Sequence, residues 1–289
     1  MDSAFLNLTP DNLAGEHLCC IIRTKTAHPG VEAKRSWLAA RLAEGHVFRK
    51  LNTRDCAFIE YAPLESAWTP IVGSSYLYIY CLWVQGAPKG HGYGRQLMEY
   101  CLRDARISGK SGVCMLGAAK QKAWLSNQAF ARKYGFETVD TAGEYELLAL
   151  RFDGSAPQFT PAARRQTIES PDLTVYYDDQ CPFIPQRIEK LRDYCAARSI
   201  AANLIHVDTL AQAKALPCVF NNWAAFYGGR LITVNQLDGP AIEAWMQKHP
   251  HAPLSSPGRR VSAAHSKNAP AHSVRWGRFP VSRLQSSVT

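Results

Sequence analysis

Apolar and polar positions follow a regular succession of helical and strand-like periods through the first half of the chain. Residues 31–45 repeat apolar side chains at helical spacing, which predicts an amphipathic helix. Residues 47–51 and 56–62 are short apolar runs separated by Asn-Thr-Arg-Asp, and they predict a strand hairpin. Residues 75–84 are rich in aromatic and branched side chains, as expected of a central strand.

A second succession of elements follows a glycine-rich stretch. Five apolar residues at helical spacing predict a helix packed on a sheet: Leu97, Met98, Cys101, Leu102 and Ala105. Residues 112–116 predict a buried strand, and residues 126–136 a short helix that Gly135 ends. Residues 145–152 predict a closing strand. We therefore expect an α/β domain over residues 1–152.

Three further zones follow this domain. Residues 153–171 hold three prolines and little apolar content, which predicts a linker. Residues 172–250 carry a second set of strands and helices, the last of them a helix with Asp238 as N-cap and Pro240 in its first turn. Residues 251–289 are rich in Ser, Ala, Pro and Arg, and they predict a disordered basic tail.

Composition and charge indicate a cytoplasmic globular protein. The 289 residues suffice for two domains, no apolar run reaches the roughly 18 residues that span a bilayer, and the N-terminus lacks the regions of a signal peptide. The net charge is +9, but residues 252–289 hold six of the basic residues and no acid, which leaves +3 for the rest. We favour a solvated extension for this basic arm, with contact to a nucleic acid or an acidic surface as the alternative, because such an arm attracts any polyanion without sequence preference. We expect no membrane and no specific nucleic acid as partner.

The nine cysteines indicate neither a disulfide framework nor a zinc site. Their number is odd, most have apolar neighbours, and no C-x-x-C pair occurs. In a reducing compartment such cysteines are mostly small buried hydrophobes. His17, Cys19 and Cys20 lie close together, but adjacent cysteines do not easily share one tetrahedral site, so we expect no metal.

The glycine run Gly90, Gly92 and Gly94 lies between a predicted strand and a predicted helix, which is the context of an anion site. A dinucleotide site needs G-x-G-x-x-G, and the spacing here is G-x-G-x-G. A mononucleotide P-loop needs G-K-[ST], and Arg95 and Gln96 follow the last glycine instead. Both templates therefore fail.

Residues 89–94 resemble the [RQ]-x-x-G-x-[GA] loop of GNAT-type N-acyltransferases, which binds the pyrophosphate of coenzyme A. Residues 82–84 resemble the L-x-V strand of that family, and residues 134–136 its closing G-F element. The amino-acid sequences of residues 16–20 and 58–71 are similar to those of the YoaP-like subgroup. The resemblance covers about residues 6–152. It implies a GNAT-type mixed sheet flanked by helices, with acetyl-CoA as cosubstrate.

The resemblance assigns a candidate coenzyme site to the end of the central strand and the loop after it. Its members are Leu82, Trp83, Val84, Lys89, Gly90, His91, Gly92, Tyr93, Gly94 and Arg95. The N–H of Val84 would face the thioester carbonyl, and residues 89–95 would hold the pyrophosphate. Lys89 stands where the family more often has Arg or Gln, and it still supplies a cation.

Acetyl transfer to an amine also needs a base and, for the thiolate, an acid. Glu60 and Glu65 are the candidate bases, because both belong to the strand and turn expected to border the acceptor cleft; that each is a solvated surface acid stays open. The family often has a tyrosine four residues before the glycine of G-F, and Ala131 occupies that position here. Water, Cys81 or a tyrosine of the central strand is left as the acid.

The order of elements in residues 172–250 resembles a smaller thioredoxin-like α/β domain. Cys181 falls where that family begins its C-x-x-C motif, and Pro217 where it has a cis-proline. Ile184 replaces the second cysteine, so no dithiol cycle can run there. A domain used for packing or partner binding is favoured over a monothiol role of Cys181.

Three functions therefore compete. The favoured one is an N-acetyltransferase that moves an acetyl group from acetyl-CoA to a primary amine of a small molecule or peptide. The others are a catalytically weak coenzyme A-binding regulatory protein, favoured by Ala131, and a monothiol redox protein acting through Cys181. The aromatic, mildly acidic residues 58–68 are compatible with a cationic amine or a peptide terminus, and a dimer is left open.

Overall fold

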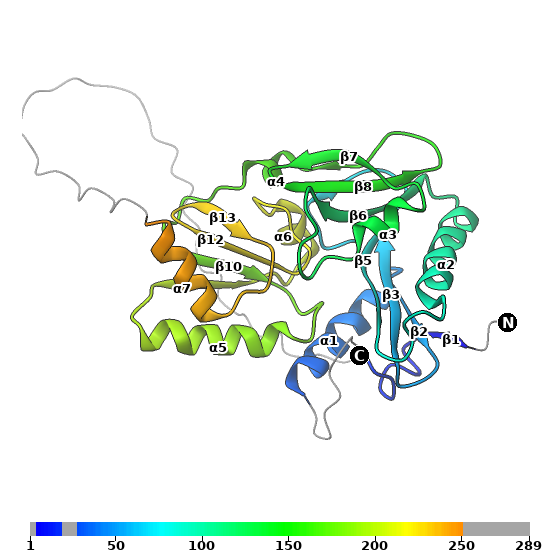
Figure 1. Cartoon of the computed structure of the whole chain (residues 1–289), viewed down its shortest axis with the longest axis horizontal. Coiled ribbons are helices and arrows are strands. Elements are labelled where there is room, and N and C mark those ends of the chain that lie inside the picture. Colours follow the sequence, from blue (N-terminus) through cyan, green and yellow to red (C-terminus); the bar gives the residue numbers. More distant parts are fainter. Residues whose placement is uncertain (1–3, 19–27, 251–289) are drawn as a thin grey trace, which may run out of the picture. The chain divides into compact units, whose positions relative to one another are not determined.

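The structure is a computed structural model that describes residues 4–18 and 28–250. The described residues belong to one compact unit, Met1–His251. Its larger part, the first lobe, is built on a seven-stranded sheet with the strand order β1-β2-β3-β5-β6-β8-β7 (Figure 1). These strands are β1 (Phe5–Asn7), β2 (Val47–Leu51), β3 (Cys56–Pro63), β5 (Tyr76–Gln85), β6 (Gly112–Ala118), β7 (Glu137–Ala142) and β8 (Tyr145–Arg151).

Helices of the first lobe flank this sheet: α1 (Pro29–Leu42), α2 (Tyr93–Ile107) and α3 (Gln128–Arg132). Within the seven-stranded sheet only β5 and β6 pair in parallel, and the other neighbouring strands are antiparallel. The mixed α/β fold predicted from the sequence is confirmed, as are the hairpin of β2 and β3 and the helix that follows the glycines.

Side chains alternate between the two faces of the large sheet because successive residues of a strand point to opposite sides. On β5, Leu77 and Ile79 pack against α2, whereas the side chains of Tyr76, Tyr78 and Tyr80 belong to the core on the other face. The buried face of α2 consists of the five residues predicted from helical spacing: Leu97, Met98, Cys101, Leu102 and Ala105.

The second lobe is a four-stranded sheet with the order β11-β10-β12-β13. Its elements are β10 (Leu173–Tyr177), α5 (Ile184–Ala197), β11 (Ala202–His206), α6 (Leu210–Ala215), β12 (Trp223–Tyr227), β13 (Arg230–Thr233) and α7 (Gly239–Lys248). Ile188 of α5 and Ile242 of α7 pack against one face of this sheet. Asp238 is the N-cap of α7, as predicted: its Oδ1 accepts a hydrogen bond from the N–H of Ala241 at 3.0 Å. The thioredoxin-like description of this lobe stays a prediction.

The segment predicted to be a linker, residues 153–171, contains two short elements. They are β9 (Gln158–Phe159) and α4 (Pro161–Arg165), and β9 pairs with β4 (Ile71–Val72) in a separate two-stranded sheet. Phe159 and Ala163 of this segment are buried. The segment therefore packs on the first lobe while it connects the two sheets.

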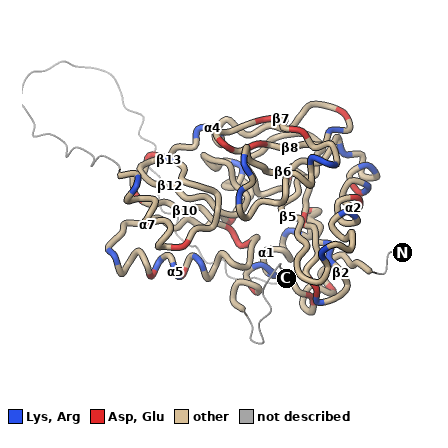
Figure 2. The backbone as a smooth tube through the Cα atoms, in the orientation of Figure 1, with Lys and Arg blue, Asp and Glu red and all other residues tan. Residues whose placement is uncertain are grey.

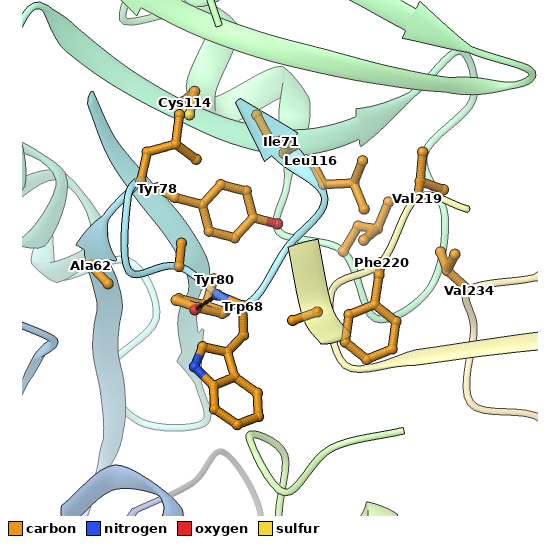
Figure 3. Close-up of a cluster of buried hydrophobic side chains, with 14 of the residues drawn as sticks. Ala62, Trp68, Ile71, Tyr78, Tyr80, Cys114, Leu116, Val219, Phe220 and Val234 are labelled. Atoms are coloured by element: carbon orange, nitrogen blue, oxygen red, sulfur yellow. Dashed lines mark hydrogen bonds between the residues drawn. The ribbon is translucent and has the colours of Figure 1, made fainter. Parts of the chain in front are cut away.

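The two lobes share one hydrophobic core (Figure 3). Tyr78 and Leu116 come from β5 and β6 of the large sheet, whereas Val219, Phe220 and Val234 come from the second lobe, and all belong to one cluster. Figure 3 shows the second-lobe residues beside those of β5 and β6, beside Trp68 and beside Ile71 of β4. The second lobe, together with α1, thus covers the face of the large sheet that α2 leaves uncovered.

Basic and acidic residues are mixed along α2 and α5 (Figure 2). Among the helices of residues 4–18 and 28–250, none is long and apolar enough to cross a bilayer. The predictions for the basic tail, 251–289, and for Cys19 and Cys20 lie outside the described residues.

Candidate functional site

The central strand β5 parts from β6 halfway along its length. Parallel pairing between the two strands runs from Tyr76 to Ile79, whereas pairing of β5 with β3 continues to Gln85. The register shifts at the same point: Glu60 pairs with Cys81 and Tyr61 with Ile79, so Tyr80 forms a bulge. Because a bulge bends its strand, it accounts for the parting of β5 from β6 and for the gap beside residues 80–85.

Two candidate coenzyme residues line this gap with their backbone. The N–H of Leu82 donates to Ser126 Oγ at 2.9 Å, which shows that it points away from β3 and toward the gap. Alternate residues of an antiparallel strand direct their N–H groups to the same side, so the N–H of Val84 points the same way. The ring of Trp83 lies on the face of the sheet opposite α2, where its Nε1 donates to Gln85 Oε1 at 3.1 Å.

The glycine loop is open and begins the long helix α2. Gly86, Gly90 and Gly92 have φ values of 74°, 83° and 74°, and no heavy atom lies within 4 Å of the place where a Cβ would stand. Gly92 is the N-cap of α2, and the first hydrogen bond at this end runs from Gln96 N to Gly92 O. The preceding N–H groups of the first turn therefore point out of the helix toward the loop.

Side chains of the glycine loop lie at the surface. Lys89, His91 and Arg95 are exposed; His91 Nδ1 lies 3.0 Å from Lys89 O, and its ring stacks on Tyr93. Arg95 Nε donates to Glu99 Oε1 at 2.7 Å, one helical turn away. Gly94 approaches Val84, since a Cβ on Gly94 would stand 3.5 Å from Val84 Cγ2. The structure thus brings the predicted loop and the predicted strand residues together.

Glu60 lies in a buried cluster on the opposite face of the sheet. It is 1% exposed, and its Oε1 accepts hydrogen bonds from Lys34 Nζ and from His46 Nε2, the latter at 2.9 Å. Its Oε2 accepts a hydrogen bond from Gln180 Nε2 of the second lobe at 2.8 Å. Lys34 and His46 are 1% and 4% exposed. Elements far apart in the sequence therefore meet at one carboxylate.

Burial and charge oppose one another at Glu60. Burial by itself would raise the pKa of this carboxyl, but the ammonium of Lys34 and the hydrogen bond from His46 outweigh it and lower the pKa. Burial also lowers the pKa of His46, which keeps its imidazole neutral near pH 7. A carboxylate only accepts hydrogen bonds, so the neutral His46 carries its proton on Nε2.

Three amide side chains of the second lobe continue from Glu60 as a chain of hydrogen bonds. Gln180 Nε2 donates to Glu60; Asn222 Nδ2 donates to Gln180 Oε1 at 2.8 Å; Gln236 Nε2 donates to Asn222 Oδ1 at 3.3 Å. All three amides are buried. We call Gln180, Asn222 and Gln236 the amide chain.

A cavity of about 100 Å³ lies between the lobes at this cluster. The first lobe lines it with Glu60, Cys81, Trp83 and Trp124, among others, and the second lobe with Cys181 and the amide chain. The wall residues Cys81 and Trp83 flank Leu82, whose N–H points into the gap on β5. The cavity and the gap therefore meet at the same stretch of β5.

Glu65 lies apart from this cavity. It is exposed, it is not among the cavity residues, and its Oε1 accepts a hydrogen bond from the N–H of Ser75 at 2.7 Å. Ser75 has a φ of 63°, so Glu65 stabilises a strained turn before β5. Of the two candidate bases, the structure brings only Glu60 to the cavity.

Ala131 of α3, which stands where the family often has the acid, is 1% exposed and packs in the core. Tyr134 is half-buried, and its ring contacts Phe130 with the centroids 5.3 Å apart. Burial, followed by the charge of Glu99, raises the pKa of its phenol. Ser126 places a hydroxyl at the gap, where its Oγ accepts a hydrogen bond from the N–H of Leu82.

Cys181 precedes α5 and lines the cavity, and its carbonyl accepts a hydrogen bond from the N–H of Ile184 at 3.0 Å. Ile184 is fully buried. None of the described peptide bonds is cis, that before Pro217 included. The described residues contain no group of three or more His, Cys, Asp or Glu side chains that could hold a metal ion.

The polar residues that continue the network from Glu60 were not predicted from the sequence: Lys34, His46, Gln180, Asn222 and Gln236. The one available indication was Lys34, a charged residue within the apolar face predicted for the helix at 31–45. The three amides carried no indication, because Gln and Asn in a polar loop are unremarkable until the fold buries them.

Comparisons with known proteins agree on one family. The profile of the acetyltransferase (GNAT) family matches residues 18–136, and the YoaP-like profile matches residues 202–243. The uncharacterized N-acetyltransferase YoaP of Bacillus subtilis (strain 168) is 34% identical over 232 residues, which cover 79% of this chain and 92% of that protein.

Two solved structures are similar to about half of the chain. A GNAT family acetyltransferase from Brucella melitensis, in complex with acetyl-CoA, is 14% identical, with a TM-score of 0.34, and covers 54% of this chain and 91% of its own. The GNAT family N-acetyltransferase YhbS from Escherichia coli, in complex with CoA, is 13% identical, with a TM-score of 0.37, and covers 54% and 88%.

Proposed function

Because this chain belongs to the YoaP family of GNAT-type N-acetyltransferases, and so is an acyltransferase that depends on acetyl-CoA, we propose that it acetylates a primary amine of a small molecule or peptide bound between its two lobes. The observation that carries this proposal is the junction at β5. The gap beside Leu82 and Val84 and the cavity that contains Glu60 meet at one stretch of strand.

In this proposal the coenzyme occupies the gap and the glycine loop. The N–H groups at the start of α2, together with the helix dipole, bind the pyrophosphate, and Lys89 and Arg95 add positive charge. Three glycines with positive φ and open space around them let the backbone approach the phosphates. Val84 N–H donates to the thioester carbonyl and stabilises the oxyanion that forms there.

Glu60 takes the proton of the acceptor ammonium in this proposal. It lines the cavity, and it is ionised at neutral pH because its pKa is lowered. A base with a lowered pKa is a weak one, so we expect a modest turnover rate that falls when Glu60 is protonated. Lys34 and His46 hold the carboxylate in place from the side away from Gln180.

Thermal unfolding with acetyl-CoA and thiol release with a panel of primary amines test the proposal. Acetyl-CoA at 100 times its dissociation constant should stabilise the protein by about 2.7 kcal/mol. Glu60→Gln should lower kcat by about 100-fold or more, the usual contribution of a general base, while Glu65→Gln should leave kcat unchanged.

Acetyl-CoA binding by Glu60→Gln serves as the folding control for that comparison. No thermal shift with wild-type protein would overturn coenzyme binding. Equal kcat values for the two variants would remove Glu60 from the role of base.

A second candidate function is a coenzyme A-binding protein with weak catalysis. Ala131 favours it, because a buried methyl group stands where the family often has the tyrosine that protonates the thiolate. Saturable acetyl-CoA binding without thiol release above the uncatalysed rate, for every amine tested, would select this second function over the first.

A further inference from the structure

The amide chain has a direction that the carboxylate imposes on it. A carboxylate only accepts hydrogen bonds, so Gln180 must turn its NH₂ group toward Glu60 and its oxygen toward Asn222. Asn222 must then donate to Gln180 and present its own oxygen to Gln236. Charge at one end of the chain thereby fixes the orientation of all three amides.

The free end of the chain is consequently a hydrogen-bond acceptor. The NH₂ group of Gln236 donates a hydrogen bond to Asn222 Oδ1, so Gln236 Oε1 is the last atom of the amide chain. This oxygen is buried, the residue is 3% exposed, and no described residue donates a hydrogen bond to it. Gln236 also lines the cavity. A buried acceptor without a donor is costly, so a ligand in the cavity that brings an N–H group to this oxygen would relieve that cost.

We propose that Gln236 Oε1 binds the ammonium group of the acceptor, so that the second lobe selects the substrate as a small primary amine with an apolar stem. The inference rests on the proposed function and names the residue that recognises the acceptor. An ammonium has three N–H donors, and one contact with Gln236 leaves two for other acceptors on the cavity wall, Glu60 among them.

The remaining walls of the cavity fit an apolar stem. Phe58 and Trp83 line it from the large sheet, and Trp124 lines it from the loop after β6. Trp124 has a φ of 68°, which is rare for a bulky residue and common at ligand clamps, and it contacts Phe183 and Arg187 of the second lobe. The volume of about 100 Å³ is smaller than the roughly 150 Å³ of a cavity that holds benzene, so it suits a short alkyl stem.

Charge alone does not explain selection in this cavity. Glu60 forms its ion pair with Lys34, and both are buried, so their charges largely cancel. Recognition by Gln236 should therefore depend on the N–H donors of the ligand and not on its positive charge. A quaternary ammonium with the same stem keeps the charge and lacks the donors, which separates the two effects.

The test is calorimetric titration of the CoA-saturated protein with butylamine, its N,N-dimethyl form and its N,N,N-trimethyl form. The first two carry at least one N–H when protonated, and the third carries none. In wild-type protein the largest loss of affinity, about tenfold or more, should come with the last methyl group, because that step removes the last donor. Loss that grows evenly with each methyl group would indicate size exclusion and overturn the proposal.

The variant Gln236→Met removes the acceptor oxygen at similar volume, and it should abolish that last step. Gln186→Met is the matched control, because Gln186 is exposed on α5 and lies outside the cavity. An unchanged methylation series in Gln236→Met would overturn the proposal, and so would failure of wild-type protein to bind butylamine. Failure to bind CoA would instead contradict the proposed function. The wild-type series decides the question if Gln236→Met does not fold.

Discussion

The coenzyme end and the acceptor end of the site are built in opposite ways. The coenzyme end is one short stretch of chain, Leu82–Arg95, whose charged side chains are exposed and three of whose glycines lie in open space. The acceptor end is buried and takes its polar groups from α1, from β3, from the segment before β2 and from the second lobe. The coenzyme end is formed by consecutive residues at the surface, whereas the acceptor end is formed in the interior by residues from distant parts of the chain.

This contrast fits the different demands of the two ligands. A pyrophosphate offers many charged oxygens, so backbone N–H groups and a few cations recognise it without burial. A small amine offers a single polar group, and selection then requires buried partners whose hydrogen bonds are costly to lose. We therefore expect substitutions at the acceptor end to alter stability strongly, and those in the glycine loop to alter mainly coenzyme binding.

The largest contrast should come from two lysines. Lys34→Met leaves the Glu60 carboxylate buried without its cation, and we expect the free energy of unfolding to fall by about 3–5 kcal/mol. Lys89→Met changes an exposed residue of the glycine loop and should alter stability by less than about 0.5 kcal/mol. Urea unfolding measures both. Equal losses would show that the acceptor end is no more tightly coupled to the fold than the loop.

The pH dependence of stability should sharpen the contrast. Burial raises the pKa of Asp178, beside the amide chain, to about 8, against roughly 3.9 in an unfolded chain. Because the folded pKa is the higher one, the stabilising protonated form is present at low pH, and stability is lost as the pH rises toward 8. We expect about 1 kcal/mol per pH unit between pH 5 and 8 from this residue.

Asp178→Asn should remove that slope, and Lys89→Met should keep it. Urea unfolding at several pH values, with the two variants beside wild type, measures the difference. A slope that persists in Asp178→Asn would assign the pH dependence to other groups.

The smallest effect should lie within the glycine loop itself. Gly92→Ala places a side chain at a φ of 74° and should cost about 1–2 kcal/mol through backbone strain, because no atom lies near the added Cβ. Gly94→Ala is the matched control: Gly94 is in the first turn of α2, and its Cβ would make ordinary contact. Thermal unfolding of both variants checks the difference, and identical melting temperatures would contradict the strain at Gly92.

The same division explains how much could be predicted from the sequence. The glycine loop, the central strand and the five core residues of α2 follow from local spacing, and each lies where the pattern predicted. The short strands β1, β4 and β9 were missed because two or three residues carry no period, and tertiary pairing alone defines them.

The acceptor end escaped prediction for a different physical reason. Its hydrogen bonds join residues up to 120 positions apart, as between Glu60 and Gln180, and no local pattern encodes such a pairing. Glu60 was predicted as a candidate base from its position in a strand, but Glu65 was an equal candidate. What separates them is burial, because the second lobe covers one carboxylate and leaves the other at the surface.

The core that the two lobes share has a consequence for synthesis of the chain. The large sheet is complete when residue 151 has left the ribosome, but Phe220 and Val234, which cover its face, follow some 70 to 80 residues later. At roughly 5–20 residues per second, that face stays uncovered for several seconds in every nascent chain. Chains released early would therefore end with an exposed apolar face, which makes them candidates for chaperone binding or aggregation.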